Sequence, residues 1–217
     1  LMTKKKGIIR LGVIGTGGMA HAHATAFQKM PGVRLAACCD LSRERAQAFG
    51  EKFGIPAVYA DADAMLEKED LAGIANVTPD SQHAVVTIAA VRHGIHVLCE
   101  KPMAATLSEA KAMLGEARRA RVINMVNISK RNAASLQAAA AFVASGGIGR
   151  VMHVEANYLQ SWLVNASWGD WRKSPGLTWR LSTRHGSAGV LGDLGCHIYD
   201  MAALLCGQEI EEIQCRL

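Results

Sequence analysis

The sequence lacks the features expected of a membrane protein, a secreted protein or a nucleic-acid-binding protein. No apolar run approaches the ~20 residues that a membrane-spanning helix needs, and no apolar segment of the signal-peptide kind follows the N-terminal lysines. The six cysteines include no Cys-x-x-Cys pair, so we expect free thiols in a reducing cytoplasm rather than a disulfide framework. The net charge of +5 is spread over scattered bases, which disfavours nucleic acid as a partner.

The composition is that of a globular chain, with 50% hydrophobic and 20% charged residues over 217 positions. Short apolar runs in the first part of the chain predict strands at 8–14, 33–39, around Val58, 72–77, 95–99 and 122–126. Helices are predicted between them at 18–30, 42–53, 63–68, 81–92 and 108–120. Continuous apolar strands separated by helices predict an α/β domain over residues 1–126, with a doubly wound parallel sheet covered on both faces.

The rhythm changes in residues 127–217. Helices are predicted at 133–144 and 189–205, with a polar loop rich in Trp and Arg between 165 and 187. Residues 151–163 alternate in character, as in a strand of an antiparallel sheet with one exposed face, and 210–217 also predict a strand. Two long strands make a poor sheet by themselves, so we expect an incomplete α+β domain with a mostly antiparallel sheet.

A glycine-rich motif stands between the first predicted strand and the first predicted helix. It reads Gly15-Thr16-Gly17-Gly18-Met19-Ala20 and fits the G-x-G-x-x-G/A pattern. In that pattern the first glycine permits a tight turn, the second lets a pyrophosphate approach the backbone, and the last small residue allows close helix–strand packing. A glycine-rich turn without a ligand is the alternative, but the strand–turn–helix context favours dinucleotide binding at the helix N-terminus.

Asp40 ends the second predicted strand, where a carboxylate accepts hydrogen bonds from the ribose 2′-hydroxyl of NAD and repels a 2′-phosphate. Alternatively Asp40 caps the next helix, although Ser42 is suited to that role. Arg43 is close enough in sequence to assist a phosphate. We therefore expect NAD as cofactor, with NADP not excluded.

The loop after the fourth predicted strand offers further candidates. Asn76, Thr78 and Pro79 lie at this strand end, and His83 follows about one helical turn later. These residues could contact the cofactor from the crevice side of the sheet. The alternative is a capped helix start with proline in its first turn, and the segment alone does not decide between the two.

Glu100-Lys101-Pro102 directly follows the apolar run 95–99. Ligands of open α/β sheets lie beyond the carboxyl ends of the strands, so Lys101 is expected at the edge of a cofactor. Farther along, Asp193 and His197 are spaced i, i+4 and share one face of a predicted helix. They could form a surface ion pair. A general base with an ammonium group near a developing alkoxide is, however, what alcohol oxidation requires.

Other catalytic classes find little support in the sequence. His21 and His23 are spaced i, i+2, point to different sides of a helix and lack a nearby cysteine or acidic partner, so we interpret them as plain helix residues and predict no metal site. No G-x-S-x-G nucleophile elbow is present.

Taken in order, these motifs resemble those of the Gfo/Idh/MocA family of NAD(P)-dependent oxidoreductases, and the resemblance covers essentially the whole chain. It rests on the glycine motif, Thr78-Pro79 with His83, Gly94-Ile95-His96-Val97 leading into Glu100-Lys101-Pro102-Met103, and Gly192-Asp193-Leu194-Gly195-Cys196-His197 with Asp200. The resemblance implies a Rossmann domain followed by an α+β domain, and hydride transfer between the nicotinamide and a sugar or polyol.

The resemblance also implies roles for individual residues. Lys101 would hydrogen-bond the reacting hydroxyl, His197 would transfer its proton, Asp193 would assist, and Glu100 would lie at the nicotinamide end. Five weaker candidates for substrate contact are Asn127, Lys130, Arg131, Trp179 and Arg180.

Family members usually extend well beyond 217 residues, so the resemblance predicts a C-terminally truncated second domain and a homo-oligomer in the full-length form. The alternatives are a non-catalytic dinucleotide-binding sensor or scaffold, an inactive fragment, or a dehydrogenase acting on another substrate class.

Overall fold

The computed structural model describes residues 7–165, 167, 169–174, 181–182 and 189–214. The chain divides into two compact units, Leu1–Asn127 and Ile128–Leu217. The first unit ends at Asn127, one residue beyond the boundary predicted from the sequence. In the described residues no helix is long and apolar enough to cross a membrane.

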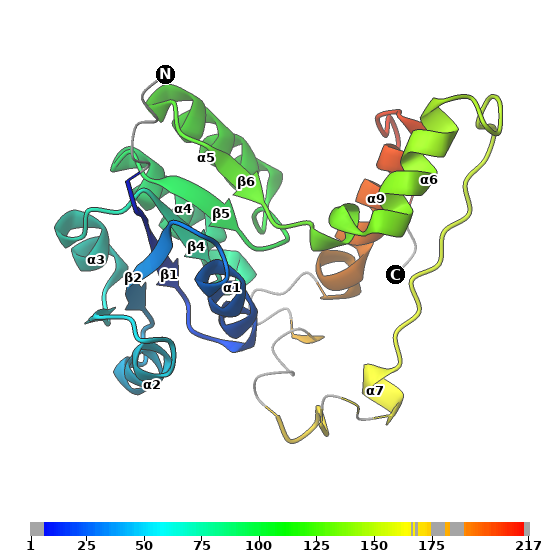
Figure 1. The fold of residues 1–217 in the computed structure, drawn as a ribbon. Coiled ribbons are helices and arrows are strands. Elements are labelled where there is room, and N and C mark those ends of the chain that lie inside the picture. Colours follow the sequence, from blue (N-terminus) through cyan, green and yellow to red (C-terminus); the bar gives the residue numbers. More distant parts are fainter. Residues whose placement is uncertain (1–6, 166, 168, 175–180, 183–188, 215–217) are drawn as a thin grey trace. The chain divides into compact units, whose positions relative to one another are not determined.

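The first unit is built on a six-stranded, all-parallel sheet in the order β3-β2-β1-β4-β5-β6 (Figure 1). The strands are β1 (Ile9–Ile14), β2 (Val33–Cys39), β3 (Ala57–Tyr59), β4 (Gly73–Asn76), β5 (His96–Cys99) and β6 (Asn124–Val126). β3 is centred on Val58, where a short strand was predicted, and each of the other strands lies within its predicted range. The prediction of a parallel α/β sheet is therefore confirmed.

Helices cover both faces of this sheet (Figure 1). They are α1 (Gly18–Gln28), α2 (Arg43–Phe53), α3 (Ala62–Lys68), η1 (Asp80–Gln82), α4 (His83–Arg92) and α5 (Leu107–Ala120). Successive strand residues point to opposite faces, so Val13 packs in a core with α1 and α2, whereas Ile14 packs in a core with α3, α4 and α5. Ser42 caps α2 by accepting a hydrogen bond from the Arg45 N–H, as predicted.

All strands run in the same direction, so their carboxyl ends meet at one edge of the sheet. The neighbouring strands β1 and β4 are far apart in sequence, and the strand order reverses between them. Ligands of open α/β sheets bind at this edge and near such a reversal. The loops after β1, β2, β4, β5 and β6 begin there, and they carry Gly15, Asp40, Thr78, Glu100 and Asn127.

The second unit contains η2 (Ser129–Asn132), α6 (Ala134–Ala144), α7 (Trp162–Asn165), the π-helical turn η5 (Leu191–Gly195) and α9 (Cys196–Cys206). The strand predicted at 151–163 is wrong for this structure: residues 151–161 have no regular secondary structure, and α7 follows. Residues 210–214 also form no strand, and 215–217 lie outside the described part. A strand needs a hydrogen-bonded neighbour, and the only bridge found among the described residues of this unit joins Ser167 to Gly169.

Three cysteines lie in the strands of the sheet and are buried. Cys38, Cys39 and Cys99 are free thiols with at most 3% exposure. Burial raises the pKa of Cys38 to about 11 and the pKa of Cys39 and Cys99 to about 12, with nearby carboxylates adding to the effect. These thiols stay protonated near neutral pH and act as small apolar side chains.

Candidate active site

The glycine motif forms the tight turn between β1 and α1. Gly15 has φ +88°, and a Cβ there would come within 2.5 Å of the Val77 carbonyl oxygen, so only glycine fits. By contrast, a Cβ on Gly17 or Gly18 would meet no protein atom within 4 Å. Gly17 is the N-cap of α1, and because glycine has no side chain, no side-chain oxygen accepts a hydrogen bond from the first N–H groups of the helix. These N–H groups are therefore available to an anion. The motif therefore combines a sterically required turn with an open cradle for a phosphate.

Asp40 lies beside this turn at the end of β2 and is 9% exposed. Its Oδ2 accepts hydrogen bonds from both the N–H and the Oγ1 of Thr16, each at 2.9 Å. Its Oδ1 accepts from the Ser42 N–H at 2.9 Å and from the Arg45 guanidinium at 2.7 Å. Burial opposes ionisation, but these hydrogen bonds, led by Arg45, outweigh burial and hold the pKa of Asp40 below its usual value. Asp40 is therefore a carboxylate fixed to the glycine turn.

Asn76 and His83 brace the loop after β4 from inside the protein. The Asn76 amide donates to the His83 carbonyl and to the Thr87 hydroxyl, and its oxygen accepts from the Thr78 hydroxyl at 2.7 Å. The two ring nitrogens of His83 lie 2.7 Å from the Pro102 carbonyl and 2.9 Å from the Thr78 carbonyl. Because Asn76 and His83 are fully buried, they hold two loops together rather than face a ligand. Thr78 and Pro79 remain at the surface of this loop.

Glu100 is the centre of a buried polar network at the end of β5. Its Oε1 lies 2.7 Å from the His23 Nε2 and accepts a 2.7 Å hydrogen bond from the Asn127 amide, while Oε2 accepts from the Lys101 N–H. Burial opposes ionisation of Glu100, but the hydrogen bonds from His23 and Asn127 prevail, and the pKa of Glu100 lies below its usual value. The network ties α1, β5 and the end of β6 together next to the half-buried Lys101, which precedes a cis peptide bond to Pro102.

In the second unit, Asp193 and His197 lie on one continuous helical segment, but residues 191–195 of it are not α-helical. Asp193 belongs to the π-helical turn η5, and His197 is the second residue of α9, with 6% exposure. Single π-helical turns inside α-helices are frequent at functional sites. The sequence pattern predicted an uninterrupted α-helix and missed this turn.

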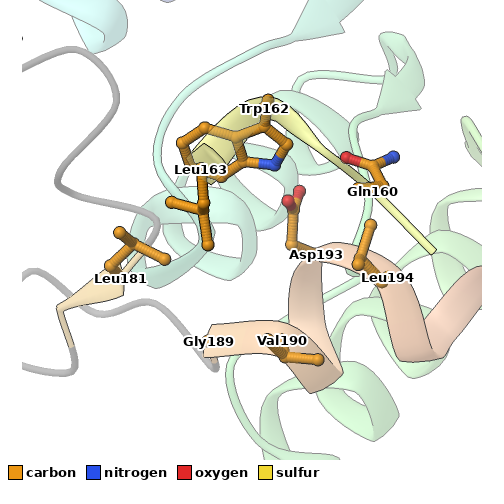
Figure 2. Close-up of a pocket in the computed structure, with 8 residues that line it drawn as sticks. All are labelled: Gln160, Trp162, Leu163, Leu181, Gly189, Val190, Asp193 and Leu194. Carbon is orange, nitrogen blue, oxygen red and sulfur yellow. The ribbon is translucent and has the colours of Figure 1, made fainter. Parts of the chain in front are cut away.

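Asp193 lines a cavity of about 170 Å³ within the second unit. Its carboxylate points toward the indole of Trp162 (Figure 2). The remaining lining residues are Gln160, Leu163, Leu181, Gly189, Val190 and Leu194. A carboxylate and an amide beside an indole ring suit a ligand that presents both hydroxyl groups and C–H surfaces.

The structure separates the remaining substrate candidates. The Nε and Nη2 groups of Arg131 donate hydrogen bonds to the carboxylate oxygens of Asp200 at 2.5–3.1 Å. The Arg131 guanidinium is therefore held by a carboxylate of the second unit. The Lys130 ammonium lies 5.8 Å from the centre of the Tyr158 ring, which in turn packs edge-on against His197 at 6.2 Å. Lys130 thus belongs to the surroundings of His197. Asn127 belongs to the Glu100 network, and Trp179 and Arg180 lie outside the described residues.

Sequence reasoning missed four neighbours of the candidate site: His23, Arg45, Tyr158 and Trp162. His23 was wrongly taken as a residue without an acidic partner; its partner Glu100 is 77 positions away. A signal existed, because His23 shares the buried face of α1 with Ala20, Ala24 and Phe27, and a polar side chain on such a face needs a partner. For Arg45, the available signal was its place in the first turn of the helix that Ser42 caps, which is near the carboxylate of Asp40.

These residues fit a dinucleotide. The space at Gly17 is open on the side where a pyrophosphate is expected, Asp40 lies where an adenosine ribose is expected, and Glu100 and Lys101 lie along the same edge of the sheet. Among the described residues, no group of three or more His, Cys, Asp or Glu side chains could hold a metal ion.

Comparison with known proteins yields matches over nearly the whole chain. The levoglucosan dehydrogenase of Pseudarthrobacter phenanthrenivorans is 30% identical over 208 residues, which cover 92% of this chain and 52% of that protein. A levoglucosan dehydrogenase structure in complex with NADH and levoglucosan has a TM-score of 0.82 at 30% identity, covering 92% of this chain and 54% of that one. An oxidoreductase domain protein from Kribbella flavida has a TM-score of 0.82 at 34% identity, covering 93% and 53%.

The chain thus spans about half the length of the relatives it matches. The family model described as "Oxidoreductase family, NAD-binding Rossmann fold" matches residues 9–128, and the model of the GFO/IDH/MocA C-terminal domain matches residues 136–217. The sheet order, the glycine turn and both matches agree, and the chain belongs to the GFO/IDH/MocA family of oxidoreductases.

Proposed function

We propose that this chain carries the cofactor-binding domain and part of the substrate domain of an NAD-dependent sugar or polyol dehydrogenase. The observation that carries the proposal is the single edge of the parallel sheet where the open glycine turn, Asp40 and Lys101 follow three strand ends. In this proposal residues 1–126 form the NAD-binding domain and 127–217 belong to the substrate and dimerisation domain.

Each residue of this edge has a distinct task in cofactor binding. The N–H groups at Gly17, Gly18 and Met19 bind the pyrophosphate, and Ala20 keeps α1 close to the sheet. Asp40 accepts hydrogen bonds from the adenosine ribose. Thr16 positions Asp40, as its two hydrogen bonds to the carboxylate indicate.

The nicotinamide end of the cofactor is contacted by the loops after β4 and β5, at the same edge of the sheet. Thr78 and Pro79 contact the cofactor from the loop after β4, and His83 holds that loop. Glu100 contacts the nicotinamide half while His23 and Asn127 fix its carboxylate.

The chemical step follows from the charges of the candidate groups. Bound NAD supplies a hydride acceptor at its nicotinamide ring. His197 accepts the proton of the reacting hydroxyl, and Lys101 hydrogen-bonds the same oxygen and stabilises its developing negative charge. Asp193 orients the base and, with Gln160 and Trp162, contacts the substrate in the cavity of the second unit.

The substrate class is proposed from the relatives and from the cavity chemistry. Proteins named levoglucosan dehydrogenase, D-apiose dehydrogenase, glucose-6-phosphate 3-dehydrogenase and myo-inositol 2-dehydrogenase match 88–94% of this chain at 26–31% identity. An indole beside a carboxylate suits a cyclic polyhydroxy compound. We therefore propose a sugar or cyclitol whose secondary hydroxyl is oxidised, and a homo-oligomer for the whole protein.

A further part of the proposal concerns residues 151–161. Their alternating pattern supports a role as a strand of an antiparallel sheet in the whole protein, where further strands supply hydrogen-bonding partners. Amide hydrogen exchange of residues 151–161 in the whole protein tests this point.

Two measurements test the function. NADH is expected to bind the 217-residue chain and raise its melting temperature; failure of NADH to bind would overturn the proposal. In the whole protein, NAD reduction is then followed with levoglucosan, myo-inositol, D-apiose and glucose 6-phosphate.

Lys101→Met is expected to lower kcat by about 100-fold or more while changing NADH affinity much less. Lys111→Met, at an exposed position of α5, is the control and should keep full turnover. Undiminished turnover in Lys101→Met would show that Lys101 has no catalytic task.

A further inference from the structure

Asp40 has its hydrogen-bonding capacity filled by the protein itself. A carboxylate offers about four acceptor sites. Thr16 fills two of them at Oδ2 through its N–H and its hydroxyl, and the Ser42 N–H and the Arg45 guanidinium fill two at Oδ1. If Asp40 is to accept hydrogen bonds from a ribose diol, one of these donors has to leave.

The four donors differ in how easily they can move. Thr16 is 4% exposed and lies in a turn that begins at the sterically required Gly15. The Ser42 N–H belongs to the backbone of the α2 N-cap. The Arg45 side chain, in contrast, is 66% exposed, although its partner carboxylate is 9% exposed. Arg45 is therefore the donor that can turn away with little cost to the fold.

Arg45 also changes the charge that a cofactor meets at this position. An unpaired carboxylate at the end of β2 repels a 2′-phosphate. With Arg45 in place, the charge of Asp40 is balanced, and a guanidinium is well suited to bind phosphate through paired N–H groups.

We propose that Arg45 sets the choice between NAD and NADP: it yields its place at Asp40 to the ribose diol of NAD, and it stays to bind the 2′-phosphate of NADP. This inference rests on the proposed dinucleotide function and deepens it. The chain then uses both cofactors, and a single mobile guanidinium sets the ratio of their affinities.

Arg43 offers a matched control, because it carries the same charge on the same helix. Two residues along an α-helix correspond to about 200° of rotation, so Arg43 faces another side of α2 than Arg45. It is exposed, and the described contacts of Asp40 involve Arg45 and not Arg43. The sequence pattern alone had pointed to Arg43 as the phosphate-binding residue.

The test is a calorimetric titration of the 217-residue chain and its variants with NADH and with NADPH. Arg45→Ala is expected to weaken NADPH binding about tenfold or more and to leave NADH binding unchanged or stronger. Arg45→Lys, which keeps the charge, should retain part of the NADPH affinity. Arg43→Ala should change the affinity ratio less than twofold. Alanine is a strong helix former, and circular dichroism verifies that α2 is retained.

The outcomes separate this inference from the proposed function. If NADH binds and Arg45→Ala leaves the ratio of NADPH to NADH affinity within twofold of the unmodified chain, Arg45 does not set the choice and the proposed function stands. If the unmodified chain binds neither cofactor, the proposed function falls and the inference falls with it.

Discussion

The two units differ in how their apolar side chains are buried. In the first unit, residues from Val13 to Ala117 supply two cores, and these cores contain large side chains that are almost completely buried, such as Phe49, Met65 and Met113. In the described part of the second unit, Trp162 is the one buried hydrophobic side chain. Large apolar residues there are exposed instead, among them Phe142, Met152, Leu159 and Ile213.

The difference shows what turns a sequence pattern into a structure. The apolar runs of the first unit pair with neighbouring strands and pack under helices, so each predicted strand forms. Residues 151–161 carry an alternating strand pattern, but no described segment pairs with them, and they remain irregular. Local pattern is necessary for a strand, and hydrogen-bonding partners and buried area decide whether it forms.

The largest expected effect concerns amide hydrogen exchange. Amides of the central strands β1 and β4 should exchange about a thousandfold or more slowly than those of residues 151–161 in the 217-residue chain, because only the former are hydrogen-bonded in a buried sheet. Exchange followed by NMR or mass spectrometry measures the ratio. Equally slow exchange at 151–161 would erase the contrast between the units. Slow exchange there in the whole protein alone would support the proposed antiparallel sheet.

The second prediction separates folding from binding within the glycine turn. Gly15→Ala should destabilise the first unit by about 3 kcal/mol, because its Cβ would clash with the Val77 carbonyl at a positive φ. Gly17→Ala meets no protein atom and should change the free energy of unfolding by less than about 0.5 kcal/mol.

Urea unfolding gives the first quantity for each variant, and titration with NADH shows whether Gly17→Ala lowers affinity by about tenfold. A Gly17→Ala chain that binds NADH with full affinity would mean that the open space at Gly17 does not hold the pyrophosphate.

The third prediction concerns the buried network of Glu100. Glu100→Gln should cost about 2 kcal/mol of stability near neutral pH, because His23 and Asn127 then lose a charged acceptor. The folded-state pKa of Glu100 lies below its ordinary value of 4.5, so the carboxylate stabilises the fold above that pH and the contribution is lost as the pH falls through the lower folded value.

The wild type and Glu100→Gln should therefore converge in stability at acidic pH, as measured by urea unfolding across the range. Glu67→Gln, at an exposed position of α3, is the control and should follow the wild-type profile. A constant difference between wild type and Glu100→Gln below pH 4.5 would contradict the ionic role.

The smallest expected effect lies in the second unit. Arg131→Met breaks the pairing with Asp200 and should cost about 1 kcal/mol, because the Arg131 side chain is 48% exposed and solvent screens the pair. The exchange rates of amides in α9 report the loss. No change in α9 would indicate that the pair does not help to hold η2 against that helix.

The sequence by itself determined that the sheet is parallel, how strands and helices alternate along the chain, and that Gly15, Asp40 and Lys101 lie at strand ends. Periodicity, caps and glycine spacing are local features, and they can be read without knowing the neighbours. The tertiary structure alone decided which polar groups meet: His23 with Glu100 across 77 positions, and Arg45 rather than Arg43 with Asp40. It also decided that 151–161 does not form a strand here, since pairing depends on partners that a linear pattern does not contain.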